Sequence, residues 1–138
     1  MADYFTHFAC RLEVGADHVA AALALHRQMA AELEADDGLA LGFEARAAIG
    51  QPGALDLHDA DAGQPEHVVA FVLRCAEAFA LTGRWGFCWA FTCSKARLDA
   101  FGGGAVALDL GQRKILAWLD AAGWLAAQLA AGRPPAAP

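Results

Sequence analysis

The segment at residues 85–92 constrains the fold more than any other part of the chain. Four large aromatic side chains alternate there with four small residues, in the order Trp85, Gly86, Phe87, Cys88, Trp89, Ala90, Phe91 and Thr92. A repeat of two residues is typical of a β-strand, which places successive side chains on opposite faces of a sheet. We therefore predict a strand with one bulky side that faces the core and one side of small residues.

The rest of the chain changes between this two-residue repeat and the 3.6-residue repeat of amphipathic helices. Besides residues 85–92, the predicted strands cover residues 4–14, 39–49, a short segment through Leu55 and Leu57, and 105–110. The predicted helices cover residues 17–36, 65–83 and 113–130. Gly102-Gly103-Gly104 lacks the G-K-[ST] ending of a phosphate-binding loop, and we interpret it as a hairpin turn before the last strand.

The resulting order, β-α-β-β-α-β-β-α, predicts an α+β fold. Its first six elements follow the ferredoxin-like split β-α-β plan, to which a C-terminal strand and helix are added. Because each strand and helix has one apolar side, we expect an antiparallel sheet with helices on one face. The 138 residues suit a single core, so we assign residues 1–131 to one domain and 132–138 to a frayed Pro/Ala tail.

The strand Trp85-Gly86-Phe87-Cys88-Trp89, a W-G-x-x-W sequence that follows the second helix, is similar to a strand in YubB-like ferredoxin-like proteins of plasmids and conjugative elements. The resemblance covers this strand and the order of elements. It implies the ferredoxin-like fold and a bacterial mobile element as the genomic setting. The family has no firm biochemical role that could be carried over to this chain.

Charge and hydropathy exclude several functional classes. The formal net charge is -6 and the basic residues are scattered or lie near acids, so we expect no binding to nucleic acid. No apolar stretch approaches ~20 residues and no secretory signal is visible, so we predict no membrane contact and a cytoplasmic location. The four cysteines contain no C-x-x-C pair, which favours free thiols and predicts no metal and no cofactor.

Polar residues on the non-core side of the predicted strands form the first candidate site: His7, Arg11, Glu44, Arg46, Asp56, His58 and Cys88. An antiparallel sheet can leave such a face open to water, to a ligand or to a second copy. A small enzyme would use His7, His58 and Cys88 there as acid, base or nucleophile, whereas a binding module would use the face as a contact surface. Asp59 and Asp61 follow in a loop that we interpret as solvated, because Gln64 occupies the place of the EF-hand glycine.

Two further residues stand out on the predicted helices. His26 lies within the apolar stripe of the first helix, as a packed histidine or as the marker of a ligand cavity. Trp124 lies opposite the apolar stripe of the third helix, where it faces solvent, the tail or a partner chain.

The chain is 57% hydrophobic and has four tryptophans, more large apolar groups than the predicted core can cover. We therefore expect a homo-oligomer, a dimer closed through Trp124, and a non-enzymatic binding or assembly module, with the small enzyme as the alternative.

Overall fold

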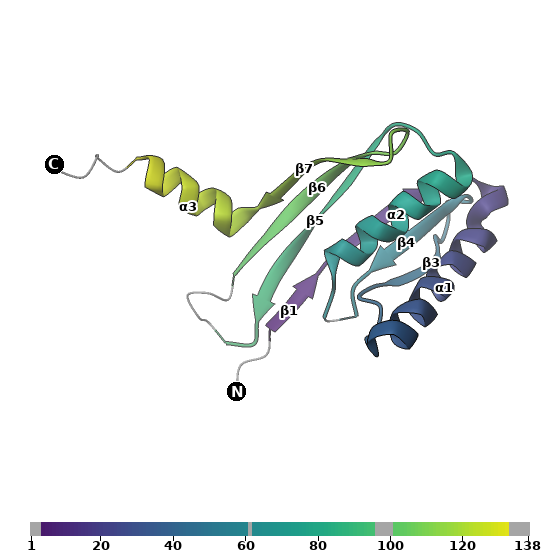
Figure 1. The fold of residues 1–138 in the computed structure, drawn as a ribbon, viewed down its shortest axis with the longest axis horizontal. Coiled ribbons are helices and arrows are strands. Elements are labelled where there is room, and N and C mark those ends of the chain that lie inside the picture. Colours follow the sequence, from purple (N-terminus) through teal and green to yellow (C-terminus); the bar gives the residue numbers. More distant parts are fainter. Residues whose placement is uncertain (1–3, 61, 96–100, 133–138) are drawn as a thin grey trace.

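A computed structural model of the protein describes residues 4–60, 62–95 and 101–132. Two antiparallel sheets meet at the consecutive strands β1 (Tyr4–His7) and β2 (Ala9–Glu13), which Phe8 alone separates (Figure 1). The predicted α+β class and the antiparallel pairing of strands are therefore confirmed. The predicted strand at residues 4–14 is divided at Phe8 because the side chain of Asp59 accepts the Phe8 N–H at 2.8 Å, which takes this donor out of the ladder.

The first sheet has the strand order β2-β4-β3, with β4 at Ala54–His58 and β3 at Glu44–Ala47. The predicted strand at residues 39–49 is thus too long. The backbone N–H of Gly42 donates to Nδ1 of His67 at 2.9 Å, so the segment before β3 is bound to the following helix and not to a strand. The second sheet has the order β1-β5-β6-β7, with β5 at Arg84–Cys93, β6 at Gly102–Asp109 and β7 at Lys114–Asp120.

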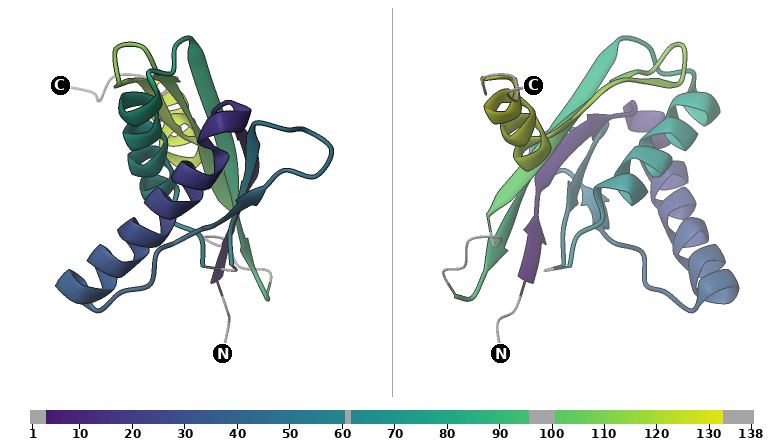
Figure 2. Two further views of the ribbon diagram at one scale, coloured as in Figure 1. Left: turned by 90° about the vertical axis from the view of Figure 1, so that its right-hand side faces the viewer. Right: turned by 60° about the vertical axis from the view of Figure 1, so that its left-hand side comes forward.

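Two helices cover one face of the sheets, as Figure 2 shows: α1 (Val19–Asp37), which follows a short 3-10 helix at Ala16–His18, and α2 (Pro65–Phe79). Gly38 ends α1 in the left-handed conformation at φ 67, where its N–H donates to the carbonyl of Glu34. Pro65 begins α2, a position at which the missing N–H costs nothing. The third helix, α3 (Ala121–Ala131), lies beyond the far end of β7, away from α1 and α2 (Figure 1).

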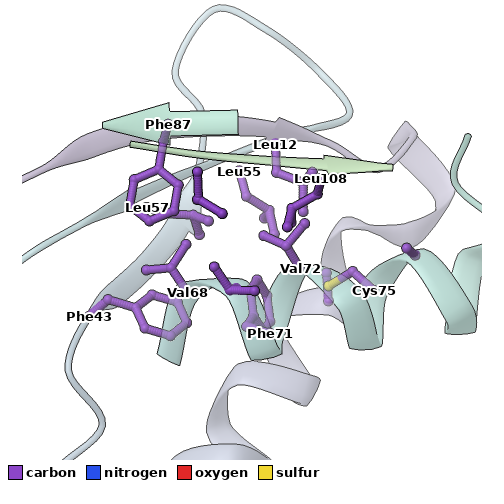
Figure 3. Packing of buried hydrophobic residues seen from close by; sticks show 14 of the residues in the cluster. Leu12, Phe43, Leu55, Leu57, Val68, Phe71, Val72, Cys75, Phe87 and Leu108 are labelled. Carbon is purple, nitrogen blue, oxygen red and sulfur yellow. The ribbon is translucent and has the colours of Figure 1, made fainter. Parts of the chain in front are cut away.

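The core fills the space between α2 and the sheets (Figure 3). Leu12, Leu55, Leu57 and Leu108 point from the strands toward Val68, Phe71, Val72 and Cys75 of α2, and each is at most 1% exposed. The predicted alternation in β5 is confirmed at its centre, because Phe87 and Trp89 are buried whereas Gly86, Cys88 and Ala90 are exposed. It does not hold for Phe91, which was expected to face the core and is 37% exposed. His26 is a packed histidine: its Nε2 lies 3.0 Å from the carbonyl oxygen of Phe43, and its ring contacts Phe43 and Phe71 edge-on.

The predicted helix at residues 113–130 is wrong in its first half, where β7 forms instead. Arg113 has a positive φ of 54, and the side chain of Asp109 accepts the N–H of Gln112 at 2.9 Å. This tight turn sends the chain back along β6 as an antiparallel strand, which satisfies its backbone groups in a ladder. The helix begins only after Asp120, whose side chain accepts the N–H of Gly123 at 2.9 Å and so caps α3.

The three glycines at 102–104 form the start of β6 and not the predicted hairpin turn. They pair with Phe91, Ala90 and Trp89 of β5. Gly103 has φ 148, and a Cβ there would overlap the backbone oxygen of Trp89. The glycines therefore allow two strands to approach closely rather than reverse the chain. Of the predicted tail at residues 132–138, residues 133–138 lie outside the described part of the chain.

Candidate functional site

Five of the predicted polar residues come together on one side of the β2-β4-β3 sheet, and we call this surface the polar sheet face: Arg11, Glu44, Arg46, Asp56 and His58. The strand register places Arg11 and Arg46 on either side of Asp56. Arg11 donates to both carboxylate oxygens of Asp56, from Nε at 2.7 Å and from Nη2 at 3.2 Å. These hydrogen bonds, with the nearby charge of Arg46, hold the pKa of Asp56 below its usual value.

His58 lies beside this ion pair and has two partners of its own. Its Nδ1 is 2.9 Å from the backbone oxygen of Asp59, an acceptor, so Nδ1 carries the proton and donates it. Its Nε2 lies 3.6 Å from a carboxylate oxygen of Glu44, which is its cross-strand neighbour. The ring is thus positioned between β3 and the loop after β4.

His7 belongs to a separate cluster at the junction of β1 and β2. Its Nδ1 lies 3.0 Å from one carboxylate oxygen of Asp59, and the other oxygen accepts the Phe8 N–H. Asp59 therefore fixes the bend between the two strands, a role that its position in the sequence did not indicate. Asp61, the other acid of this loop, lies outside the described residues.

Cys88 is exposed on the small-residue side of β5, opposite Ala105 of β6 and two residues from Ala90, the strand partner of His7. Among the described residues, no hydrogen bond joins His7, His58 and Cys88. Burial raises the pKa of the Cys10 and Cys75 thiols to about 12, which keeps both protonated at neutral pH. The use of His7, His58 and Cys88 together in a small enzyme stays a prediction.

An open hollow of about 360 Å³ lies on the polar sheet face between Arg11, Arg46, Asp56 and His58. A small polar ligand could enter it, although Arg11 is already held by Asp56 and by the side-chain oxygen of Gln51. Within residues 4–60, 62–95 and 101–132, no group of three or more His, Cys, Asp or Glu side chains is arranged to hold a metal ion.

The second site is the C-terminal arm, which we define as β7 and α3, residues 114–131. Every one of its residues is exposed. Its large apolar side chains are between 36% and 61% exposed: Ile115, Leu116, Trp118, Leu119, Trp124, Leu125 and Leu129. Trp124, predicted to face away from the core, is 55% exposed.

Only Trp124 of this apolar set was singled out from the sequence. The other six were assigned to one long helix, whose apolar stripe was expected to be covered by the sheet. Asp120, followed by small residues, is an N-cap signal that divides the segment correctly.

Helix α3 has no polar side. Of its 11 residues, Gln128 alone is polar, and none is buried. Helices that are apolar on all sides are found inside globular proteins or membranes. No helix in the described part of the chain has the length and apolar character needed to cross a membrane.

Comparison of the chain with protein-family models, with curated proteins and with solved structures finds no match.

Proposed function

We propose that this protein is a non-enzymatic assembly module that self-associates, as a dimer, through its C-terminal arm. The observation that carries the proposal is the exposure of seven large apolar side chains within the 18 residues of β7 and α3. Soluble monomers rarely expose a continuous apolar patch larger than a few hundred Å². A patch of this size on a folded chain is typical of a protein interface.

The exposed area is close to what a stable dimer needs. The seven side chains are about half exposed on average, and each can present roughly 200 Å², so the arm offers on the order of 700 Å² per chain. A standard interface buries about 800 Å² on each partner. This area lies on both sides of β7, since Trp118 pairs with Val106 and Leu119 with Ala105, so a dimer would cover part of it.

A second copy is the occupant that the charges favour. The arm has one positive and one negative residue, Lys114 and Asp120, so its net charge is zero and the other residues carry the whole formal charge of -6. Nucleic acid or an anionic lipid surface would require several basic residues beside the apolar ones. An apolar, neutral surface instead matches the same surface on another copy.

The polar sheet face supports the assembly module over a small enzyme. The side chains proposed as acid, base and nucleophile have separate partners, since His7 is bound to Asp59 and His58 lies between Glu44 and the Asp59 carbonyl. A general base must lie within hydrogen-bond reach of the group it activates. Among the described residues, no hydrogen bond links either histidine to Cys88.

We assign the rest of the chain to the ferredoxin-like split β-α-β plan. The strand order β2-β4-β3, continued by β1-β5 on the other side of Phe8, with α1 and α2 as the two crossovers, supports this plan. β5 contains the W-G-x-x-W sequence, which supports the resemblance to YubB-like proteins and a setting on a plasmid or conjugative element. On this plan, β6 and the C-terminal arm are additions.

Sedimentation equilibrium from 1 to 100 μM tests the proposal. We expect the wild type to be a dimer at tens of micromolar, and Trp124→Ala to weaken the dimer about 30-fold, as removal of an interface tryptophan does. Ile49→Ala is the matched control, because Ile49 is 85% exposed in the turn between β3 and β4 and outside the arm. A wild type that stays monomeric over this range, or an equal effect of both substitutions, would contradict the proposal.

A further inference from the structure

We propose that the two copies exchange their α3 helices, so that α3 of each chain packs on the aromatic face of the other chain. The aromatic face is the side of β5-β6-β7 that bears Phe87, Trp89, Ile115 and Trp118. This inference rests on the proposed self-association and names the surface that receives α3. It follows from three features: the connection between β7 and α3, the incomplete cover of the aromatic face, and the closure of two identical contacts.

Helix α3 cannot cover the strand that precedes it. β7 ends at Asp120 and α3 begins at Ala121, so no residue connects them. A helix that folds back on its own strand needs a connection of about two to six residues. Because Asp120 also caps the helix through the Gly123 N–H, α3 continues beyond the end of β7 (Figure 1). Since none of the described elements buries a residue of α3, we place the surface that receives it on another chain.

The aromatic face is only partly covered within one chain. The register places Trp118 opposite Val106 and Ile115 next to Leu108, so these four side chains share the side on which α2 lies. Val106 and Leu108 are 4% and 0% exposed, whereas Trp118 and Ile115 are 40% and 48% exposed. Helices α1 and α2 thus bury the apolar side chains of β6 but not those of β7, although both strands bear large apolar side chains on this side.

The uncovered part of this face is already ordered for contact. The rings of Trp118 and Trp89 lie 5.1 Å apart and tilted by 53°, and Trp89 in turn contacts Phe87 at 5.4 Å. A fixed aromatic surface loses little side-chain entropy when a partner binds. The opposite side of these strands bears the small residues Cys88, Ala105 and Ala107, with Leu119 beside Ala105. It bears none of the aromatic side chains of β5, β6 and β7.

Exchange also closes the assembly at two copies. Each chain has one α3 without cover and one aromatic face without a helix, so a two-fold axis forms two identical contacts at once. A contact between the two α3 helices alone would leave Trp118 and Ile115 exposed in the dimer. The two arrangements therefore differ in whether substitutions on β7 weaken the dimer.

The test combines a variant of α3, Leu125→Glu, with a variant of the aromatic face, Ile115→Glu. Leu125 is 52% exposed on α3 and Ile115 is 48% exposed on β7, so neither substitution buries a charge in the core of one chain. Each variant alone should dimerise at least 30-fold more weakly than the wild type. Trp118→Ala is a second face variant that adds no charge, and circular dichroism at 1 μM checks that all three remain folded.

The decisive measurement is a mixture. Fluorescently labelled Leu125→Glu is sedimented with an excess of unlabelled Ile115→Glu. The labelled Leu125→Glu chain keeps an intact aromatic face, and the unlabelled Ile115→Glu chain keeps an intact α3. One undamaged contact then forms in the mixed dimer, so the labelled chain should associate at least 10-fold more tightly than with excess unlabelled Leu125→Glu.

The exchange of α3 helices would be overturned if the mixture showed no tighter association, or if neither Ile115→Glu nor Trp118→Ala weakened the wild-type dimer. The proposed self-association would stand in both cases. A monomeric wild type would overturn both.

Discussion

Helices α2 and α3 are both rich in apolar residues, yet their environments are opposite. Seven of the 15 residues of α2 are buried, including Val68, Phe71 and Val72, whereas none of the 11 residues of α3 is buried. The difference comes from the chain that connects each helix to its strand. The segment from Asp59 to Gln64 lets α2 turn back over the sheet, but α3 follows β7 without any connecting residue. An apolar helix thus stays exposed when its connection to the preceding strand is too short to return it to the sheet.

The largest expected difference is between substitutions of a large apolar residue in each of the two helices. Phe71→Ala removes a side chain that is 0% exposed and should cost about 3–5 kcal/mol of unfolding free energy. Leu129→Ala removes one that is 61% exposed and should cost less than about 1 kcal/mol in the monomer. Urea denaturation at submicromolar concentration measures both values.

The same pair of variants should behave differently when the protein is concentrated. If the arm is covered in a dimer, the loss caused by Leu129→Ala grows with protein concentration, because dimerisation stabilises the folded state by mass action. A loss for Leu129→Ala that is large at submicromolar concentration would show that α3 is covered within one chain.

A smaller effect is expected for Gly86→Ala, which changes the strands that carry the arm. A Cβ at Gly86 would overlap the carbonyl oxygen of Val106 in β6, so β5 and β6 must move apart. We expect a loss of about 1–3 kcal/mol in thermal or urea unfolding. Gly132→Ala is the control, because its Cβ would meet only atoms at 3.8 Å. Equal stability of the two variants would mean that the close approach of β5 and β6 is unnecessary.

The smallest effect is expected on the polar sheet face, where Asp56→Asn should change the pH dependence of stability. Hydrogen bonds from Arg11 lower the pKa of Asp56 in the folded protein relative to about 3.9 in the unfolded chain. A lowered pKa stabilises the fold above the unfolded value, and this contribution is lost as pH falls through the folded value. The stability difference between wild type and Asp56→Asn should therefore be constant above about pH 5 and disappear on acidification below pH 4.

Arg11→Gln provides the reciprocal test of this ion pair. Removing Arg11 removes the main cause of the lowered pKa, so the variant should lose the same pH-dependent part of stability in thermal melts between pH 2 and 7. A pH dependence that persists in Arg11→Gln would assign it to another carboxyl group.

The periodic parts of the fold could be predicted from the sequence. Residues 85–92 and α2 have strong repeats, and their large apolar positions, such as Phe87 and Val72, are buried as expected. β7 could not be predicted in this way. Ile115, Leu119 and the alanines that follow fit a helical repeat equally well, and the choice was made by the turn at Arg113 and by pairing with β6.

The candidate sites show the same division. That Arg11, Arg46 and Asp56 lie on the non-core side follows from alternation along each strand, but their contact depends on the β2-β4-β3 register. The register of β1 with β5 brings His7 opposite Ala90, two residues from Cys88, whereas His58 lies on β4 in the other sheet. The use of these three side chains as one site stays a prediction.

By itself, the sequence determined which side chains share a face of each strand or helix, since that depends only on local backbone geometry. It also determined that the arm is apolar and neutral. Only the tertiary structure decided that β7 and α3 are left exposed by the rest of the described chain. Cover depends on which elements meet and on the length of chain between them, and these are set by strand pairing and turns over the whole molecule.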